Sequence, residues 1–213
     1  MGIPINKSGD KLIINIPSRD LTAEEIALAR LIFGETIKYQ AVKVFKVDYL
    51  PNQQEETIVT PNGNLYPAKK VYRENYALDS DSMKHLFIHE MAHVWQSRKG
   101  MWVRLIGAKI HTCARLNDTN PYLYNIHQTF GSKVIKMQTS QNKSVSNIVT
   151  IKSKLSDYNM ESQAEIIADY WALKFKRNPD LMITKNFETN VRARNLDAVI
   201  RLYEEKVKQA IGA

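Results

Sequence analysis

Apolar and polar residues alternate in parts of the N-terminal half, and between those parts apolar residues recur at helical spacing. The alternation over residues 12–16 predicts a short strand. A helix is then predicted to begin at Thr22, because Glu25 follows it at the spacing of a capping box, and to end at Gly34. The chain is therefore expected to open with a strand followed by a helix.

The next patterns predict strands. Residues 41–49 alternate apolar side chains with lysines, which is typical of a strand. Two short runs within residues 57–66 flank Pro61-Asn62-Gly63, a strong turn signal, and together they predict a hairpin. Residues 134–137 and 148–151 predict two strands joined by a polar run. The rest of this middle part of the chain shows no clear secondary-structure pattern.

Helical spacing dominates the remainder. Residues 83–97 form a predicted helix that follows the N-cap-rich run 79–82 and ends near Gly100. Its apolar positions cover most of its circumference, so this helix is expected to be buried on several sides. Further helices are predicted over residues 160–176 and 187–210, which makes the C-terminal half mostly helical.

Length and composition predict a single soluble domain over residues 1–213. No apolar run is long enough to span a bilayer, and the N-terminus lacks the basic-then-apolar pattern of a secretory signal. We therefore expect synthesis in the cytoplasm and, for any export, a route without a cleaved leader. The one cysteine, Cys113, excludes an internal disulfide and a cysteine-rich zinc site.

The net charge of +8 raises the question of a nucleic-acid or membrane-surface partner. The lysines and arginines are scattered along the chain, however, and no nucleic-acid motif accompanies them. We interpret the charge as a solvated basic surface and expect no nucleic-acid partner.

The chemistry is concentrated in His89-Glu90-Met91-Ala92-His93. Residues four apart lie on one face of a helix, so His89 and His93 can both bind one zinc ion. Glu90 projects beside the metal, where it can take a proton from a water molecule whose pKa zinc lowers to about 7. Inside a buried helix these groups need such a role, because an unpaired buried carboxylate is costly.

A catalytic zinc needs a third protein ligand, and the predicted helix from residue 160 is the best source. Its acids Glu161, Glu165 and Asp169 are four residues apart and share one face. We favour Glu161 as the ligand, with Glu165 orienting a histidine. In the alternative register, Glu165 is the ligand and Asp169 is the orienting group. A further alternative gives these acids no role at a metal and places them on a solvated helix face.

Other histidines and tyrosines could assist. His85 lies one turn before His89 and is interpreted as a packed or ligand-orienting residue. His111, His127, Tyr158 or Tyr170 could stabilise the oxyanion of a tetrahedral intermediate, although a structural role is favoured for each of them.

Several blocks resemble the metallopeptidase domains attached to VgrG spike proteins and Rhs-type toxins of type VI secretion systems. The most specific block is the helix around His89 and His93. The blocks are Leu21-Thr22 to Ile32-Phe33-Gly34, Tyr49-Leu50-Pro51, Thr60-Pro61-Asn62-Gly63-Asn64-Leu65-Tyr66, His85-Leu86-Phe87-Ile88-His89-Glu90-Met91-Ala92-His93-Val94-Trp95-Gln96 and Gln163-Ala164-Glu165.

The resemblance implies an α+β zincin fold in which a small mixed sheet packs on the active-site helix. It also implies zinc held by His89, His93 and a downstream glutamate, and peptide-bond hydrolysis used against rival bacteria, in the target-cell periplasm. The implied partners are a protein or peptide substrate, a cognate immunity protein and a secretion spike. The chain departs from the pattern because it carries no spike domain, which predicts a free effector or an excised domain. Residues 101–157 match nothing, so the choice between a protein and a peptidoglycan peptide as substrate stays open.

The mechanistic hypothesis is that Glu90 deprotonates the attacking water and returns a proton to the leaving amine. The hairpin around Asn62-Gly63 would supply an edge strand for an extended substrate. Two other classes remain as alternatives. One is a zincin-like binding module with a structural or absent metal, and the other is a binder of anionic surfaces.

Overall fold

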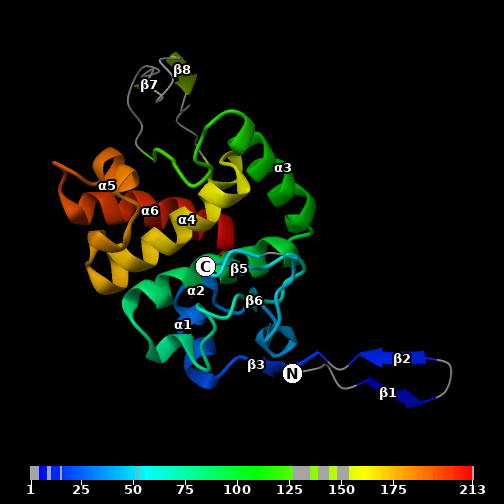
Figure 1. Ribbon diagram of the computed structural model, residues 1–213. Coiled ribbons are helices and arrows are strands. Elements are labelled where there is room, and N and C mark those ends of the chain that lie inside the picture. The colour runs from blue at the N-terminus through cyan, green and yellow to red at the C-terminus, as the bar shows by residue number, and fades with distance from the viewer. Residues whose placement is uncertain are drawn as a thin grey trace.

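The computed structural model has a mixed α+β architecture that is mostly helical and carries small two-stranded sheets (Figure 1). No helix of the described part of the chain is long and apolar enough to cross a membrane. The structure describes residues 5–8, 11–14, 16–51, 53–126, 135–138, 144–147 and 154–212.

The strands pair in the antiparallel sense as β1–β2, β3–β4, β5–β6 and β7–β8. The helices are α1 (Ala23–Phe33), α2 (Asp81–Arg98), α3 (Val103–Leu116), α4 (Met160–Trp171), α5 (Thr184–Asn190) and α6 (Leu196–Ile211). The strands are β1 (Ile5–Ser8), β2 (Lys11–Ile14), β3 (Ser18–Asp20), β4 (Lys43–Phe45), β5 (Ile58–Val59), β6 (Tyr66–Pro67), β7 (Ile135–Gln138) and β8 (Ser144–Asn147).

Helix α1 begins and ends where its sequence predicts. The Thr22 hydroxyl accepts a hydrogen bond from the Glu25 amide at 3.2 Å, and the Glu25 carboxylate accepts one from the Thr22 amide at 2.9 Å. Gly34 follows with a positive φ of 51°, which suits glycine. The buried Glu25 also pairs with Arg19 at 2.8 Å and accepts from the Tyr76 amide. The cap therefore also ties α1 to the segment leading into α2.

The predicted hairpin is confirmed as β5–β6, and within the described residues no other strand pairs with β5. A parallel bridge between Val44 and Leu65 joins it to the β3–β4 pair, so the small sheet is mixed. Ile58 of β5 lies opposite Pro67, which has no amide hydrogen to donate. This is therefore a non-hydrogen-bonded pair, and the backbone groups of Ile58 point away from β6.

Helix α4 forms the centre of the helical part. It lies between α2 and α6 (Figure 1), and every one of its residues is buried. The expectation that α2 is buried on several sides is confirmed over its second half, from Phe87 to Gln96. Charged side chains on the facing surfaces of α2 and α4 are consequently shielded from water.

A non-helical segment, residues 121–126, is held against the helices by asparagine side chains. Asn186 donates to the Tyr122 carbonyl at 3.1 Å and accepts from the Tyr124 amide at 3.2 Å. Asn190 does the same with the Tyr124 carbonyl and the Ile126 amide, at 3.1 and 2.9 Å. These bonds fix Tyr122 and Tyr124 beside the α2–α4 interface.

The C-terminal helix predictions need correction. The helix predicted over residues 187–210 is two helices, because the chain turns at Ala193, with a φ of 63°, and Asn195 caps α6. The helix predicted over residues 160–176 is α-helical only to Trp171 and continues as a π-helical turn, Ala172–Lys176.

Helix α3 was not predicted. Gly107 lies in the middle of α3, and glycine is unfavourable in the interior of a helix. In the structure a Cβ atom at this position would lie 3.3 Å from the Met160 side chain, so the glycine permits α3 to approach α4 closely. Tertiary packing therefore outweighs the low helix propensity.

Two strand predictions also shift. The strand predicted over residues 41–49 is shorter, spanning only Lys43–Phe45, because the following residues form bends. The strand predicted over residues 134–137 is found one residue on as β7, and its partner β8 lies within the run that was expected to be a connector. Residues 148–151 lie outside the described residues.

Candidate metal centre

Helices α2 and α4 pack against each other in antiparallel orientation, and histidines of α2 pair with acids of α4. Residue numbers increase along α2 where they decrease along the facing part of α4, and successive pairs are four residues apart on each helix. This spacing places all of the pairs on one face of each helix. The pairs are His85–Asp169, His89–Glu165 and His93–Glu161.

Gln96 determines which nitrogen of His93 carries the proton. Its amide nitrogen donates to the Met160 carbonyl at 3.0 Å and to the Gln163 side chain at 3.2 Å, so its oxygen faces the imidazole. His93 Nδ1 lies 2.7 Å from that oxygen and must be the donor. The lone pair of neutral His93 is therefore on Nε2, which faces Glu161.

His89 is oriented in the same way by an acid. Its Nδ1 lies 2.9 Å from Glu165 Oε2, which leaves Nε2 directed toward Glu161. Glu161 Oε2 lies 3.1 Å from Nε2 of His93 and 3.6 Å from Nε2 of His89. Ligand atoms of His89, His93 and Glu161 all lie within 4.8 Å of one another. Two imidazole nitrogens and one carboxylate oxygen thus converge on one point.

Burial alone would raise the pKa of Glu161. The imidazoles of His111, His89 and His93, where they carry a proton toward Glu161, outweigh burial and hold that pKa below its usual range. Glu161 also lies in the first turn of α4, where the helix dipole favours a negative charge. Glu161 is thus an ionised carboxylate, the form that can bind a metal.

Glu90 lies beside this group and is held by the hairpin. The Thr60 hydroxyl, at the end of the β5 segment, donates to Glu90 Oε2 at 2.6 Å, and both side chains are buried. Burial raises the pKa of Glu90, although the charges of His93 and His89 and the bond from Thr60 act in the opposite direction. The fold therefore provides a desolvated carboxylate with one fixed oxygen.

Four acids are buried in and beside this interface. The ion pairs of these acids within the described residues are all to histidines, with no lysine or arginine among them. Burial lowers the pKa of His89, but its contacts with Glu161 and Glu165 outweigh burial and raise that pKa well above its usual value, so without a metal a proton on the imidazole balances these acids. A divalent cation can take the place of such protons, and the donor set of two nitrogens and one oxygen fits zinc. The acids concerned are Glu90, Glu161, Glu165 and Asp169.

A cleft of about 340 Å³ opens onto His89, Glu90 and Glu165, and its volume is within the range of ligand sites. Tyr122 closes one side, and its ring centroid lies 5.8 Å from that of His89. Burial and the nearby charges of Glu161, Glu90 and Glu165 raise the pKa of Tyr122, so its phenol stays neutral. The cleft is lined by Glu56, Thr57, Ile58, His85, Leu86, His89, Glu90, Tyr122, Glu165, Leu181 and Ile183.

The pair at the opposite end of the interface is closed by further hydrogen bonds. His85 Nε2 lies 2.8 Å from Asp169 Oδ1, and the Tyr124 hydroxyl donates to Asp169 Oδ2. Tyr124 and Tyr203 also share a hydrogen bond at 2.6 Å. Burial and the charge of Glu165 raise the pKa of Asp169. Both oxygens of this acid therefore have protein partners.

The other candidate residues named in the sequence analysis differ in where the structure places them. His111 on α3 joins the metal centre, with Nε2 at 3.2 Å from Glu161 Oε1. Tyr158 donates to the Asn125 carbonyl and Tyr170 to Glu204, so neither hydroxyl faces the cleft. His127 lies outside the described residues.

Sequence reasoning missed Thr60, Gln96 and Tyr122. A signal existed for Gln96, which follows His93 by three residues and so shares its helix face. Thr60 and Tyr122 come from a hairpin and an irregular segment, and nothing in their local sequence indicates a site.

No family model matches the chain. The chain is 32% identical over 160 residues to the type VI secretion system spike protein VgrG2b of Pseudomonas aeruginosa, an alignment that covers 73% of this chain. It spans 13% of the length of that relative. The solved effector domain of P. aeruginosa VgrG2b superimposes with a TM-score of 0.57 at 29% identity, covering 80% of this chain and 82% of the domain. The chain is therefore homologous to the effector domain of VgrG2b.

Proposed function

We propose that the chain is a zinc-dependent metallopeptidase with a zincin fold, acting as an effector of a type VI secretion system. The observation that carries the enzymatic part is the orientation of His89 and His93. Glu165 and Gln96 occupy their Nδ1 atoms, so both Nε2 lone pairs face Glu161. Partners of this kind orient metal-binding histidines and set their tautomers.

His89, His93 and Glu161 would hold the zinc ion, with Glu165 and Gln96 as the orienting partners. When bound, zinc supplies Lewis-acid polarisation of the scissile carbonyl and acidifies the attacking water. The alternative register, with Glu165 as ligand, fits less well because the nearest oxygen of Glu165 contacts Nδ1 of His89 rather than Nε2.

Glu90 is the general base in this proposal. It accepts a proton from the attacking water and then passes a proton to the leaving amine. The hydrogen bond from Thr60 fixes one carboxylate oxygen at 2.6 Å, so the other is available to the water. Exclusion of solvent from Glu90 raises its pKa and makes it a stronger base than an exposed carboxylate.

The free edge of β5 is proposed to bind the substrate backbone. Ile58 directs its N–H and C=O groups away from β6 and lines the cleft beside His89 and Glu90. An extended peptide can add to such an edge through main-chain hydrogen bonds. The hairpin would thus position the peptide and, through Thr60, the base.

The effector role rests on the homology to the VgrG2b effector domain. On this basis we also propose delivery by a secretion spike, action in the periplasm of the target cell, and a cognate immunity protein. Periplasmic expression of wild-type and Glu90→Gln chains in a susceptible bacterium tests this part. Growth arrest by the wild type alone is expected, and equal growth would contradict it.

Metal content is the first test of the enzyme. Elemental analysis of the wild type should give about one zinc per chain, and His93→Ala should lose it. Zinc should also raise the midpoint of thermal unfolding in the wild type but not in the variant. Absence of zinc from both proteins after metal loading would overturn the proposal and favour a metal-free binding module.

Measurements of peptide hydrolysis distinguish the role of Glu90 as base from the role of the zinc ligands. Glu90→Gln should retain zinc and its unfolding midpoint while peptide hydrolysis falls by about 10²–10⁴-fold, the usual contribution of general base catalysis. Hydrolysis by the wild type should stop with a chelator and return with zinc. A Glu90→Gln variant that cleaves at the wild-type rate would exclude the proposed role of Glu90.

A further inference from the structure

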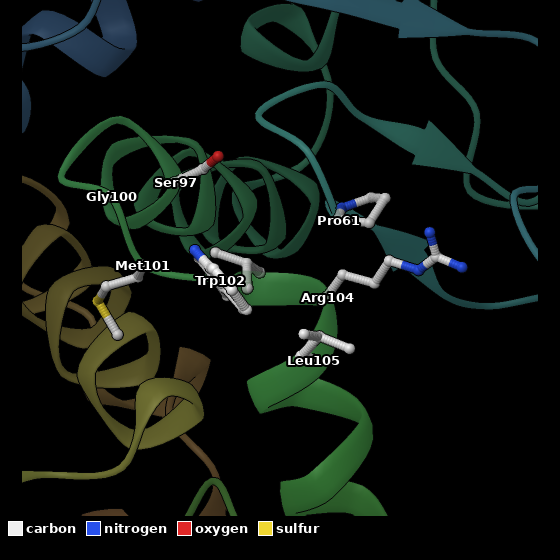
Figure 2. A pocket seen from close by; sticks show the side chains of 8 residues that line it. Pro61, Ser97, Gly100, Met101, Trp102, Arg104 and Leu105 are labelled. Carbon is white, nitrogen blue, oxygen red and sulfur yellow. The ribbon is translucent and has the colours of Figure 1, made fainter.

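A second pocket, of about 590 Å³, lies between the end of α2, the β5–β6 turn and the start of α3. Figure 2 shows Pro61 of the turn on one side, Ser97 of α2 on another, and Trp102 with Leu105 at the start of α3. Trp102 is 72% exposed and Leu105 is 58% exposed. Large apolar side chains grouped this way on a surface are typical of a binding site.

This pocket and the catalytic cleft both adjoin the segment that runs from β5 into the turn beside Glu90. Ile58 lines the cleft, Thr60 contacts Glu90, and Pro61 lines the second pocket. Along α2 the order is the same, because His89 lines the cleft and Ser97 lines the second pocket two turns further on. Both hollows are therefore bordered by α2 and by the β5–β6 hairpin, the two elements that carry and hold the base.

We propose that the second pocket binds a bulky apolar side chain of an extended peptide whose backbone lies along β5. The inference rests on the proposed function and names its substrate class. Ile58 and Pro61 are three residues apart in the chain, a span of at most about 10 Å. A peptide paired with this edge and cut beside Glu90 would thus place a side chain two or three residues from the cut in the pocket.

The lining determines which side chain fits. Met101, Trp102 and Leu105 offer apolar and aromatic surface, and Arg104 forms a side wall, its guanidinium carbon 5.8 Å from the Tyr49 ring centroid. An aromatic or large aliphatic side chain buries the most apolar area here. Peptidoglycan stem peptides carry only small or charged side chains, so the pocket favours extended segments of proteins as the substrate.

Tryptophan fluorescence tests binding without catalysis. Trp95 and Trp171 are 6% and 1% exposed, so acrylamide quenching reports mainly on Trp102. Zinc-loaded Glu90→Gln protein is titrated with acetylated hexa-alanine peptides carrying one Phe, Leu, Asp or Lys. Phe and Leu peptides should protect Trp102 and bind about 10–100-fold more tightly than Asp or Lys peptides. Equal protection by all four peptides would overturn the inference.

Cleavage profiling of a denatured protein digest tests the same pocket in the active enzyme. Wild type should cut with an enrichment of aromatic and large aliphatic residues at one fixed distance from the cut. Leu105→Ala should lose that enrichment, whereas Leu116→Ala, an equivalent change at the other exposed end of α3, should keep it. An enrichment unchanged in Leu105→Ala would overturn the inference.

The two proposals fail in different ways. Cleavage that needs zinc and Glu90 but shows no dependence on the pocket would contradict only the inference about the second pocket. Protection of Trp102 by Phe peptides in a chain that cleaves nothing would support the pocket and contradict only the peptidase.

Discussion

The two ends of the α2–α4 interface use the same kind of residue pair in different ways. At one end His93 and His89 direct Nε2 toward Glu161. At the other end His85 pairs with Asp169, whose second oxygen accepts from Tyr124. The first end leaves two imidazole nitrogens directed at one carboxylate, whereas the second uses every oxygen of its acid within the protein.

The difference shows that the number of remaining partners, more than residue type, decides what a buried histidine–acid pair can do. A carboxylate whose oxygens are both satisfied by protein donors holds helices together. A carboxylate that faces several acceptor nitrogens needs a cation to complete the group. The metal end should therefore govern zinc binding, and the closed end should govern stability.

Replacing the acid at each end of the interface in turn should give the largest effects. Asp169→Ala removes the acid from His85 and Tyr124 and should lower the free energy of unfolding by about 3–5 kcal/mol, as for other broken buried pairs. Its zinc content should stay at about one per chain. Urea unfolding in chelator and elemental analysis measure the two quantities.

Glu161→Gln is the matched variant for the metal end. It should lose zinc but change the free energy of unfolding in chelator by less than Asp169→Ala does, because its amide still fits beside His93 and His111. If both variants lost zinc and stability equally, the division between the two ends would be wrong.

The next effect concerns the tautomer of a ligand. Gln96→Leu removes the acceptor for His93 Nδ1 and should weaken zinc binding by about 10–100-fold, the usual cost of losing such a partner. Competition with a chromophoric chelator gives the dissociation constant. Gln209→Leu, an exposed change of the same type on α6, should leave it unchanged. Unaltered affinity in Gln96→Leu would contradict the proposed orienting role.

The smallest effect is expected at the outer end of the closed network. Tyr203→Phe removes one hydrogen bond to Tyr124, which keeps its bond to Asp169. The free energy of unfolding should fall by about 1 kcal/mol, the typical value for one such bond, with no change in zinc affinity. A loss of zinc in this variant would show that the two ends are coupled through α4.

Local sequence signals predicted the elements whose boundaries depend on local chemistry. The capping box of Thr22 and Glu25, the turn at Pro61-Asn62-Gly63 and the N-cap run before α2 all appear where expected. Helix α3 escaped because Gly107 is present for contact with α4, and such a contact has no local signature. The break before α6 escaped because the apolar positions continue with helical spacing on both sides of it.

By itself, the sequence determined that His89, Glu90 and His93 share a turn of helix and that acids four residues apart follow on a later helix, because helical spacing is a local property. Only the tertiary structure decided that Glu161 faces both Nε2 atoms while Glu165 and Gln96 take the Nδ1 atoms. That choice depends on the direction and register of α4 against α2. Packing between distant segments sets both, and it also brings Thr60 and Tyr122 to the site.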